Sequence, residues 1–326
     1  MKAERGGPER SPRRKINGVV LVDKPTGITS NAALQRVRRA FNADKAGHTG
    51  TLDPLASGLL PVCLGEATKF SVGLLDADKR YRAVIQLGVR TETGDSEGAI
   101  VATRLPPSDF EPIELVLHSF RGDIQQRPHR YSAIKRDGRA LYSYARAGEE
   151  VEIAPRAVSI HALDVESWEP PLLTIDVFCS KGTYIRSLAE DIGEAIGCGA
   201  HVVALRRTMV GHLALQEAAS LEAIEASGDA FRDSLLRPMS VLVGALPRIE
   251  LEEDDARHFL HGRRVATPAL QVRSEALFTV HRRSIEGDKG FLGIARICVD
   301  EDGSSLVPAR VISPAGDPAT GKPLQA

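Results

Sequence analysis

The sequence has few cysteines, no excess of charge of either sign and no long apolar run. Its four cysteines lie far apart and form no Cys-x-x-Cys pair, which excludes the common zinc and redox motifs and indicates free thiols in a reducing compartment. No apolar run approaches the roughly 20 residues that cross a bilayer, and the first residues hold no hydrophobic signal core. We therefore expect a soluble, cytoplasmic protein with no membrane segment and no metal site.

Charge is balanced over the whole chain but not along it. The 42 Lys and Arg residues nearly match the 43 Asp and Glu residues, so net charge alone does not indicate a polyanionic partner. Residues 125–148 differ, because six basic residues stand there against the single acid Asp137, with three tyrosines among them. Basic side chains neutralise phosphates and aromatic rings stack on unpaired bases, so this segment indicates an RNA-binding surface. The alternative is that the tyrosines pack the segment onto the body of the protein.

The length and composition predict more than one domain. A chain of 326 residues with 42% hydrophobic content is long enough for a large core and a smaller second one. Segments with little to bury predict disordered tails at both ends, the first of them basic. The expected divisions are a tail over 1–15, a large domain over 16–240 with an insertion at about 125–152, a smaller domain over 247–313 and a tail over 314–326.

Apolar periodicity predicts a mixture of strands and helices. Alternating or continuous apolar runs predict strands over 18–22, 80–89, 158–168, 172–179 and 202–210 and, in the smaller domain, over 277–280, 290–299 and 306–312. Helical spacing predicts helices after Ser30, across 110–120, after Thr183 and across 221–240. The hydroxyl groups of Ser30 and Thr183 are expected to cap the helices that follow them.

One stretch, residues 47–60, combines turn-forming residues with a single acid. It reads Gly-His-Thr-Gly-Thr-Leu-Asp-Pro-Leu-Ala-Ser-Gly-Leu-Leu, and its glycines, proline and threonines favour a folded-back loop over a regular helix. Asp53 is therefore displayed on a loop. An Asp before a Pro often bonds to its own backbone in a turn, so composition alone leaves open whether Asp53 is structural or chemical.

Several motifs, in the same order along the chain, resemble those of the TruB family, the synthases that make pseudouridine 55 in the TΨC arm of tRNA. They include residues 24–30 (Lys-Pro-Thr-Gly-Ile-Thr-Ser), the Asp53 loop and residues 180–186 (Ser-Lys-Gly-Thr-Tyr-Ile-Arg). The resemblance implies an α+β fold: a catalytic domain over 16–240 with a mixed, mainly antiparallel sheet, a thumb insertion, and a small C-terminal PUA-like β-barrel. It implies isomerisation of uridine 55 on a flipped-out base.

The resemblance also implies roles for individual residues. Asp53 is the expected nucleophile and Arg186 the cation that pairs with it. Substrate-binding roles are implied for Tyr81, Tyr184 and Leu205, and we also expect His48 and Lys69 to contact the substrate. The tRNA-binding thumb is expected to use Arg127, Arg130, Tyr131, Lys135, Arg136 and Arg139. No cofactor or obligate protein partner is implied, and we expect a monomer that binds the T-arm stem-loop of tRNA.

The thumb departs from the family pattern at one point. Family members usually read Gln-x-Pro-Pro-x-Tyr-Ser-Ala, whereas this chain has His129 in place of the second proline, followed by Arg130. The main alternative function is a non-catalytic RNA-binding or tRNA-folding protein, because a basic and aromatic surface alone does not require catalysis. Methylation of RNA bases lacks support, since no Gly-x-Gly cofactor loop follows a strand.

Overall fold

The computed structural model describes residues 12–132, 134–149, 151–267, 275–283, 285, 290–300 and 303–313. Most of both predicted tails therefore lies outside the described residues. The prediction of a disordered tail is wrong at Arg14, whose backbone amide donates to the carbonyl of Asn42 at 2.7 Å and whose guanidinium pairs with Asp233 at 2.6 Å. These two long-range contacts fix Arg14 against the body of the protein. Among the described residues, no helix is both long and apolar enough to cross a membrane.

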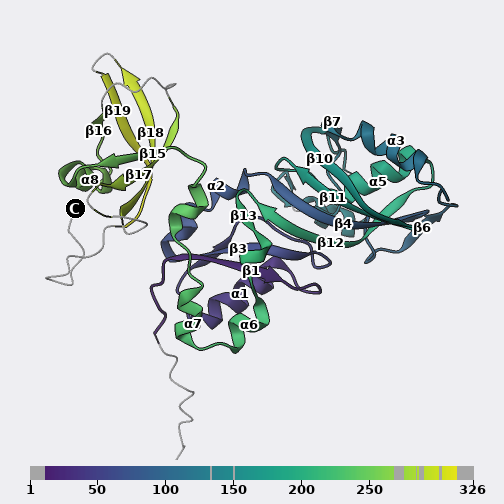
Figure 1. Ribbon diagram of the computed structural model, residues 1–326, viewed down its shortest axis with the longest axis horizontal. Coiled ribbons are helices and arrows are strands. Elements are labelled where there is room, and N and C mark those ends of the chain that lie inside the picture. The colour runs from purple at the N-terminus through teal and green to yellow at the C-terminus, as the bar shows by residue number, and fades with distance from the viewer. Residues whose placement is uncertain are drawn as a thin grey trace, which may run out of the picture.

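A ten-stranded mixed sheet forms the larger part of the molecule (Figure 1). Its strands are β1 (Gly18–Lys24), β2 (Ala46–His48), β3 (Ser57–Leu64), β4 (Lys79–Leu87), β7 (Gly122–Gln126), β10 (Arg156–Glu169), β11 (Leu172–Cys179), β12 (Ala200–Val210), β13 (Leu213–Ala214) and β14 (Ala219–Ser220). The order is β14-β1-β3-β12-β4-β11-β10-β7, with β13 on β12 and β2 on β3. Only β1 with β14 and β12 with β3 run parallel, so the predicted mixed, mainly antiparallel sheet is confirmed.

Helices cover the sheet at two places. Helix α3 (Glu111–Ser119) and helix α5 (Ile185–Ile196) share one apolar core with β4, β10, β11 and β12. Helix α1 (Ser30–Ala40) and helix α6 (Leu221–Ala226) share a second core with β1 and β3. Figure 1 shows the first pair at one end of the sheet and the second pair at the other.

The predicted helix across 221–240 is wrong in its length. Helix α6 ends at Ala226, and helix α7 (Asp229–Ser234) follows after an extended Ser227 and Gly228. A 3-10 helix, η3 (Met239–Val243), comes after Pro238. Serine and glycine favour leaving a helix and proline cannot continue one, so the apolar spacing alone concealed two breaks.

The helix caps differ from those predicted, and the difference matters for the Asp53 loop. Thr29 caps α1, while the Ser30 hydroxyl donates to the Leu52 carbonyl at 3.0 Å and accepts from the Leu52 amide at 2.7 Å. The Thr183 hydroxyl donates to the Ser180 carbonyl at 2.9 Å, and α5 begins only at Ile185. Both hydroxyls therefore fix loops that lead to the site.

The loop around Asp53 is shorter than the predicted stretch over 47–60. Strand β2 ends at His48 and strand β3 begins at Ser57, so the loop spans residues 49–56. The end of the predicted stretch is strand because residues 58–64 are buried and pair with β1 along its length. The apolar run Leu-Leu-Pro-Val-Cys-Leu was the signal for this strand.

A separate five-stranded sheet lies near the C-terminus. It contains β15 (Arg248–Leu251), β16 (Val265–Thr267), β17 (Leu277–Arg282), β18 (Phe291–Asp300) and β19 (Gly303–Val311), in the order β15-β17-β18-β19-β16, with helix α8 (Glu253–Leu260). This curled sheet fits a PUA-like half-barrel. It contacts the larger part through Phe291, whose ring meets that of Phe70 edge-on with centroids 5.0 Å apart. Phe70 follows the 3-10 helix η1 (Gly65–Lys69), which leads into helix α2 (Val72–Leu75).

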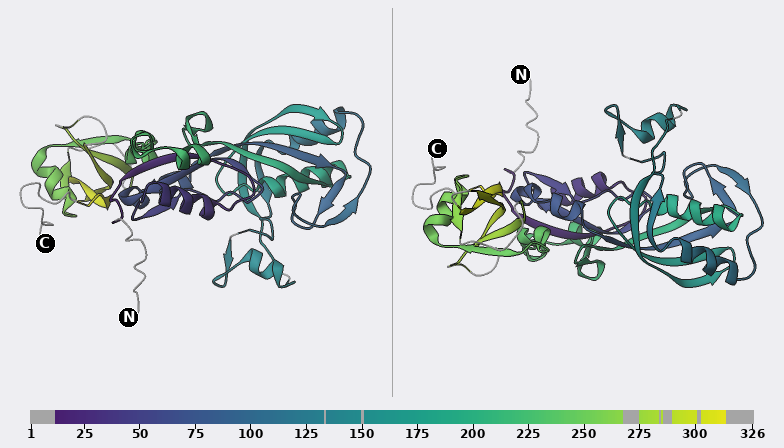
Figure 2. Two further views of the ribbon diagram at one scale, coloured as in Figure 1. Left: turned by 90° about the horizontal axis from the view of Figure 1, so that it is seen from below. Right: turned by 90° about the horizontal axis from the view of Figure 1, so that it is seen from above.

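Two small hairpins complete the described fold. Strands β5 (Val89–Thr91) and β6 (Ile100–Thr103) form one. Strands β8 (Lys135–Arg136) and β9 (Arg139–Ala140) form the other, followed by helix α4 (Leu141–Arg146). Figure 2 shows this second group, in teal, standing away from the sheet. The remaining element is the 3-10 helix η2 (Leu215–Glu217).

Candidate functional site

A cavity of about 390 Å³ opens beside the Asp53 loop. Five of the residues named from the sequence line it: Asp53, Tyr81, Tyr184, Arg186 and Leu205. They come from four separate parts of the chain, namely the loop after β2, strand β4, the start of α5 and strand β12. The fold therefore brings these distant residues to one concave surface.

Asp53 and Arg186 form an ion pair at the wall of this cavity. Nη2 of Arg186 lies 2.9 Å from Oδ2 of Asp53. The arginine side chain is only 8% exposed, whereas the aspartate side chain is 40% exposed. The carboxylate is thus open to a ligand while the cation that orients it belongs to the buried wall.

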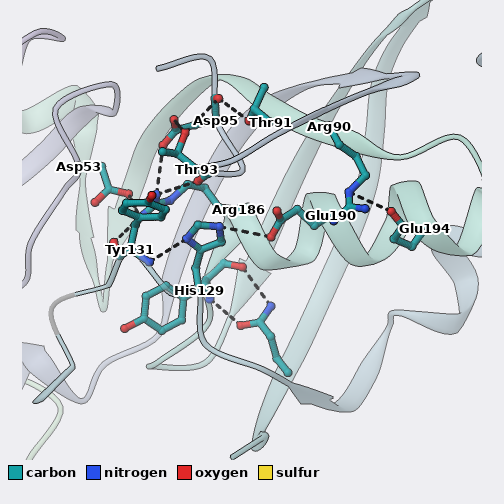
Figure 3. Close-up of polar contacts among 12 residues, drawn as sticks. Asp53, Arg90, Thr91, Thr93, Asp95, His129, Tyr131, Arg186, Glu190 and Glu194 are labelled. Carbon is teal, nitrogen blue, oxygen red and sulfur yellow. Dashed lines mark hydrogen bonds and ion pairs between the residues drawn. The ribbon is translucent and has the colours of Figure 1, made fainter. Parts of the chain in front are cut away.

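Three further acceptors hold the guanidinium of Arg186. Its Nη1 donates to the Thr93 carbonyl at 3.0 Å and to Oδ2 of Asp95 at 3.1 Å, and its Nη2 also donates to the Tyr131 carbonyl at 3.1 Å (Figure 3). The planar fork of an arginine suits such a set of acceptors, and two carboxylates compensate its buried charge. Arg186 therefore has one orientation, and Asp53 is aligned against it.

Asp95 is a site residue that the sequence reading missed. It lies in the loop between β5 and β6 and is 2% exposed. Its Oδ1 accepts from the Thr93 hydroxyl at 2.5 Å and from the Glu97 amide at 3.1 Å. The polar residues around Asp95 indicate a turn that this acid stabilises. Nothing in the local sequence indicates that it faces Arg186, 91 residues away.

Gln126 fixes the start of helix α5. This fully buried side chain donates to the Tyr184 carbonyl at 3.0 Å and accepts from the Tyr184 amide at 2.7 Å. The two bonds satisfy both backbone polar groups of Tyr184, the residue that precedes the helix, and fix its position. Arg186 then lies in the first turn, where its side chain reaches the cavity.

Three buried cations surround the Asp53 loop. Arg207 is 1% exposed and donates to the carbonyls of Leu59 at 2.8 Å and Gly50 at 3.2 Å, which ties strand β12 to the loop. Burial lowers the pKa of Lys24 to about 8, and the nearby Asp53 opposes that shift. Burial, with a smaller effect of Arg207, lowers the pKa of Lys79 to about 8. The loop carboxylate thus lies in a positively charged surrounding.

Tyr81 and Leu205 lie on neighbouring antiparallel strands. In the register of β4 and β12, Tyr81 pairs with Arg207 and Ala83 pairs with Leu205. Burial raises the pKa of the Tyr81 phenol, and the charge of Arg207 partly opposes this. The phenol is therefore neutral at physiological pH and presents an aromatic ring with one hydroxyl donor to the cavity.

Two of the expected substrate-binding residues, Lys69 and His48, lie outside the cavity lining. Lys69 pairs with Glu66 at 2.6 Å and donates to the carbonyl of Val311 and the hydroxyl of Ser313, both at 3.2 Å. It therefore lies at the junction with the C-terminal sheet. His48 is half-buried in β2, where burial and the charge of Arg207 lower its pKa.

The basic residues of the insertion are mostly exposed, and some of their guanidinium groups lie over tyrosine rings. The guanidinium of Arg139 lies over the Tyr144 ring at 4.3 Å, and that of Arg130 lies over the Tyr131 ring at 5.3 Å. Tyr142 is itself exposed. Tyr142 and Tyr144 thus support cations of the insertion, whereas Tyr131 also attaches the segment to the body, because its hydroxyl donates to Oε1 of Glu92 at 2.7 Å. Lys135, Arg127 and Arg136 are also exposed.

Comparison with known proteins places the chain in a family. A profile described as "TruB family pseudouridylate synthase (N terminal domain)" matches residues 38–185, and one described as "tRNA pseudouridylate synthase B C-terminal domain" matches residues 186–243. A protein of Burkholderia mallei named tRNA pseudouridine synthase B is 51% identical, over 88% of this chain and 92% of its own length. A protein of the same name from Ralstonia pickettii is 53% identical, over 79% of this chain and 82% of its own.

Solved structures share the fold. A chain from an H/ACA RNP bound to a substrate RNA containing 2′-deoxyuridine superposes with a TM-score of 0.69 at 25% identity, covering 91% of this chain and 85% of that one. A chain from a Cbf5-Nop10-Gar1 complex gives a TM-score of 0.68 at 26% identity, with 90% and 84% covered. With the profiles spanning residues 38–243 and relatives about half identical over most of the sequence, the chain belongs to the TruB family of pseudouridylate synthases.

Proposed function

We propose that this protein is a tRNA pseudouridine synthase that converts uridine 55 of the TΨC loop to pseudouridine. The observation that carries the proposal is the half-exposed carboxylate of Asp53, held 2.9 Å from the buried guanidinium of Arg186 at the wall of a cavity of about 390 Å³. Relatives named tRNA pseudouridine synthase B, about half identical in sequence, support the choice of substrate.

The reaction suits an oriented carboxylate. The bond between N1 and the ribose C1′ breaks, a bond between C5 and C1′ forms, and N1 gains a proton as C5 loses one. Pseudouridine contains the same atoms as uridine, so no co-substrate is consumed. Attack on the ribose and addition to the pyrimidine both require a nucleophilic carboxylate, and we assign that role to Asp53. Arg186 fixes its direction and compensates its charge.

The uridine has to leave its stack to reach Asp53, at a cost of about a few kcal/mol. The side chains of Tyr81, Tyr184 and Leu205 line the cavity and supply ring and apolar surface that offset part of this cost. We assign these three residues to binding of the flipped base. His48, next to the loop in β2, is assigned to the space that the base vacates.

The remaining surfaces are assigned to the tRNA body. We propose that the insertion over 125–152 acts as a thumb that contacts phosphates of the T arm, and that the C-terminal sheet, within 247–313, is an RNA-binding domain of the PUA type. Lys69, at the junction of that sheet with the catalytic domain over 16–240, is assigned to RNA contact there. We also infer that the protein acts as a monomer in the cytoplasm.

The direct test is to incubate the purified protein with an unmodified tRNA transcript and to map pseudouridine by position. The expected result is conversion at uridine 55, and no product in a transcript that carries cytidine at that position. Tight binding without any product would contradict the proposal and favour the non-catalytic RNA-folding alternative. Light scattering of the protein, alone and with the transcript, tests the assigned monomer.

A further inference from the structure

His129 is a buried imidazole, 6% exposed, in the first part of the insertion, three residues after the end of β7. Its Nδ1 accepts a hydrogen bond from the backbone amide of Tyr131 at 3.2 Å. The imidazole also stacks on the Tyr131 ring, with centroids 5.9 Å apart and planes inclined by 27°. The side chain therefore holds the peptide at Tyr131 in a local turn.

The other end of the imidazole faces helix α5. Nε2 of His129 lies 3.5 Å from Oε2 of Glu190 (Figure 3). Because Nδ1 accepts a hydrogen bond, the single proton of the neutral ring is on Nε2, toward the carboxylate of Glu190. Glu190 is four residues after Arg186, so both lie on the same face of the helix. The segment from His129 to Tyr131 is thus attached to α5 at two places one turn apart.

A third element packs against the same pair. A Cβ atom added at Gly94 would lie 3.0 Å from Nε2 of His129 and 3.1 Å from the carboxyl carbon of Glu190. Gly94 has φ of +67° and directly precedes Asp95, which pairs with Arg186 at 3.1 Å. The imidazole is therefore enclosed by the insertion segment, by helix α5 and by the loop that supplies Asp95.

We propose that His129 is a positioning residue for the Asp53 site. By holding the Tyr131 amide, it directs the Tyr131 carbonyl onto Nη2 of Arg186, the same atom that pairs with Asp53 at 2.9 Å. Without that acceptor, Arg186 loses one of its four fixed partners and Asp53 is less precisely aligned. The inference rests on the proposed function, and it predicts a loss of rate rather than of RNA affinity.

A pair of isosteric substitutions separates positioning from packing. In His129→Asn the side-chain oxygen can accept from the Tyr131 amide, as in an Asx turn. The leucine of His129→Leu has nearly the same shape as that asparagine but has no acceptor. The readouts are the single-turnover rate of pseudouridine formation on a T-arm stem-loop and the Kd for the same RNA. We expect the Leu variant to be slower by about tenfold or more, and Kd to change little in either variant. The Asn variant keeps the acceptor but loses the contact with Glu190, so we expect it to be only severalfold slower than wild type.

Two substitutions on helix α5, one of them a control, test the contact at Nε2 of His129. Glu190→Ala removes the partner of Nε2 and is expected to reduce the rate severalfold. Glu194→Ala, one turn further along and paired with Arg90 at 3.1 Å, is expected to leave it unchanged. A Leu variant at position 129 as fast as wild type, or an Asn variant as slow as the Leu variant, would overturn the positioning role. A wild-type protein that forms no pseudouridine would refute the proposed function itself, and this inference with it.

Discussion

Asp53 and Arg186 are paired at 2.9 Å, yet one side chain is 40% exposed and the other 8%. Because of this difference, the arginine is part of the fixed wall of the cavity, and the aspartate is the group that contacts a ligand. Arg186 is also paired with the buried Asp95 at 3.1 Å, so one guanidinium is held between an open carboxylate and a closed one. The open carboxylate takes its direction from this arrangement.

Arg186→Lys tests whether the shape of the cation matters in addition to its charge. A lysine keeps the charge but has only three N–H donors on one nitrogen, so it cannot hold all four acceptors of Arg186. We expect kcat to fall by about a hundredfold while the Kd for a T-arm stem-loop stays within about threefold. Single-turnover kinetics and a binding titration measure the two quantities. Equal loss of rate and affinity would show that Arg186 holds the RNA rather than Asp53.

Asp95→Asn tests the closed carboxylate through stability. The change leaves Arg186 with less compensation in a buried surrounding, and breaking a buried pair costs about 3 kcal/mol or more. Urea unfolding of wild type and variant measures the difference. Asp229→Asn, which changes an exposed carboxylate paired with Arg232 at 2.5 Å, is the control and is expected to cost much less. A similar small cost for both variants would contradict a structural role for Asp95.

Lys79 gives a pH signature. Its pKa in the folded protein is lowered to about 8, whereas an unfolded lysine keeps its proton up to about 10.5. Between these values the unfolded state binds more protons, so the contribution of Lys79 to stability increases as pH rises. Relative to Lys79→Met, the unfolding free energy of wild type is expected to rise by up to about 3 kcal/mol from pH 7.5 to 10.5.

The control for this pH series is Lys181→Met. Lys181 is exposed and pairs with Asp76 at 2.8 Å. Lys181→Met also removes one lysine, but from the surface, so the difference between the two variants isolates the effect of burying the amine. Parallel curves for wild type and the Lys79 variant would mean that Lys79 keeps its proton in the folded state.

Arg130→Ala combined with Arg136→Ala tests the thumb. Each neutralised phosphate contributes to the salt dependence of binding, so we expect weaker binding and a slope of log K against log salt that is shallower by about 1 to 2. Arg80→Ala combined with Arg82→Ala is the matched control. These two exposed arginines flank Tyr81 in strand β4, so they face away from the cavity. An unchanged slope for the thumb variant would exclude the thumb from the interface.

Much of the strand pattern could be predicted because it depends on neighbours in sequence. The expected strand over 172–179 matches β11, and the runs at 80–89 and 202–210 correspond to β4 and β12. Their pairing brings together Tyr81 and Leu205, which the family resemblance had named. The strand at Ser57–Leu64 was missed because its first residues were read as part of a glycine-rich loop.

The family resemblance implied the pair of Asp53 with Arg186, but the other long-range polar contacts of the site could not be predicted, since each depends on a partner far along the chain. Ser30 was expected to cap a helix, but the backbone of Leu52, 22 residues on, takes its hydroxyl. Asp95 and Gln126 looked like ordinary polar residues until the fold placed them against Arg186 and Tyr184. Local patterns identify which element forms, and only the tertiary structure decides which side chains meet.

The central claim, that Asp53 carries out the isomerisation, is tested most directly by Asp53→Asn. The amide keeps the size and the loop but is a far weaker nucleophile. Formation of pseudouridine 55 in a tRNA transcript is measured beside RNA affinity for wild type and variant. The account predicts near-complete loss of product with Kd within about tenfold, because phosphate contacts supply most of the binding. Product formed by the variant at the wild-type rate would contradict it.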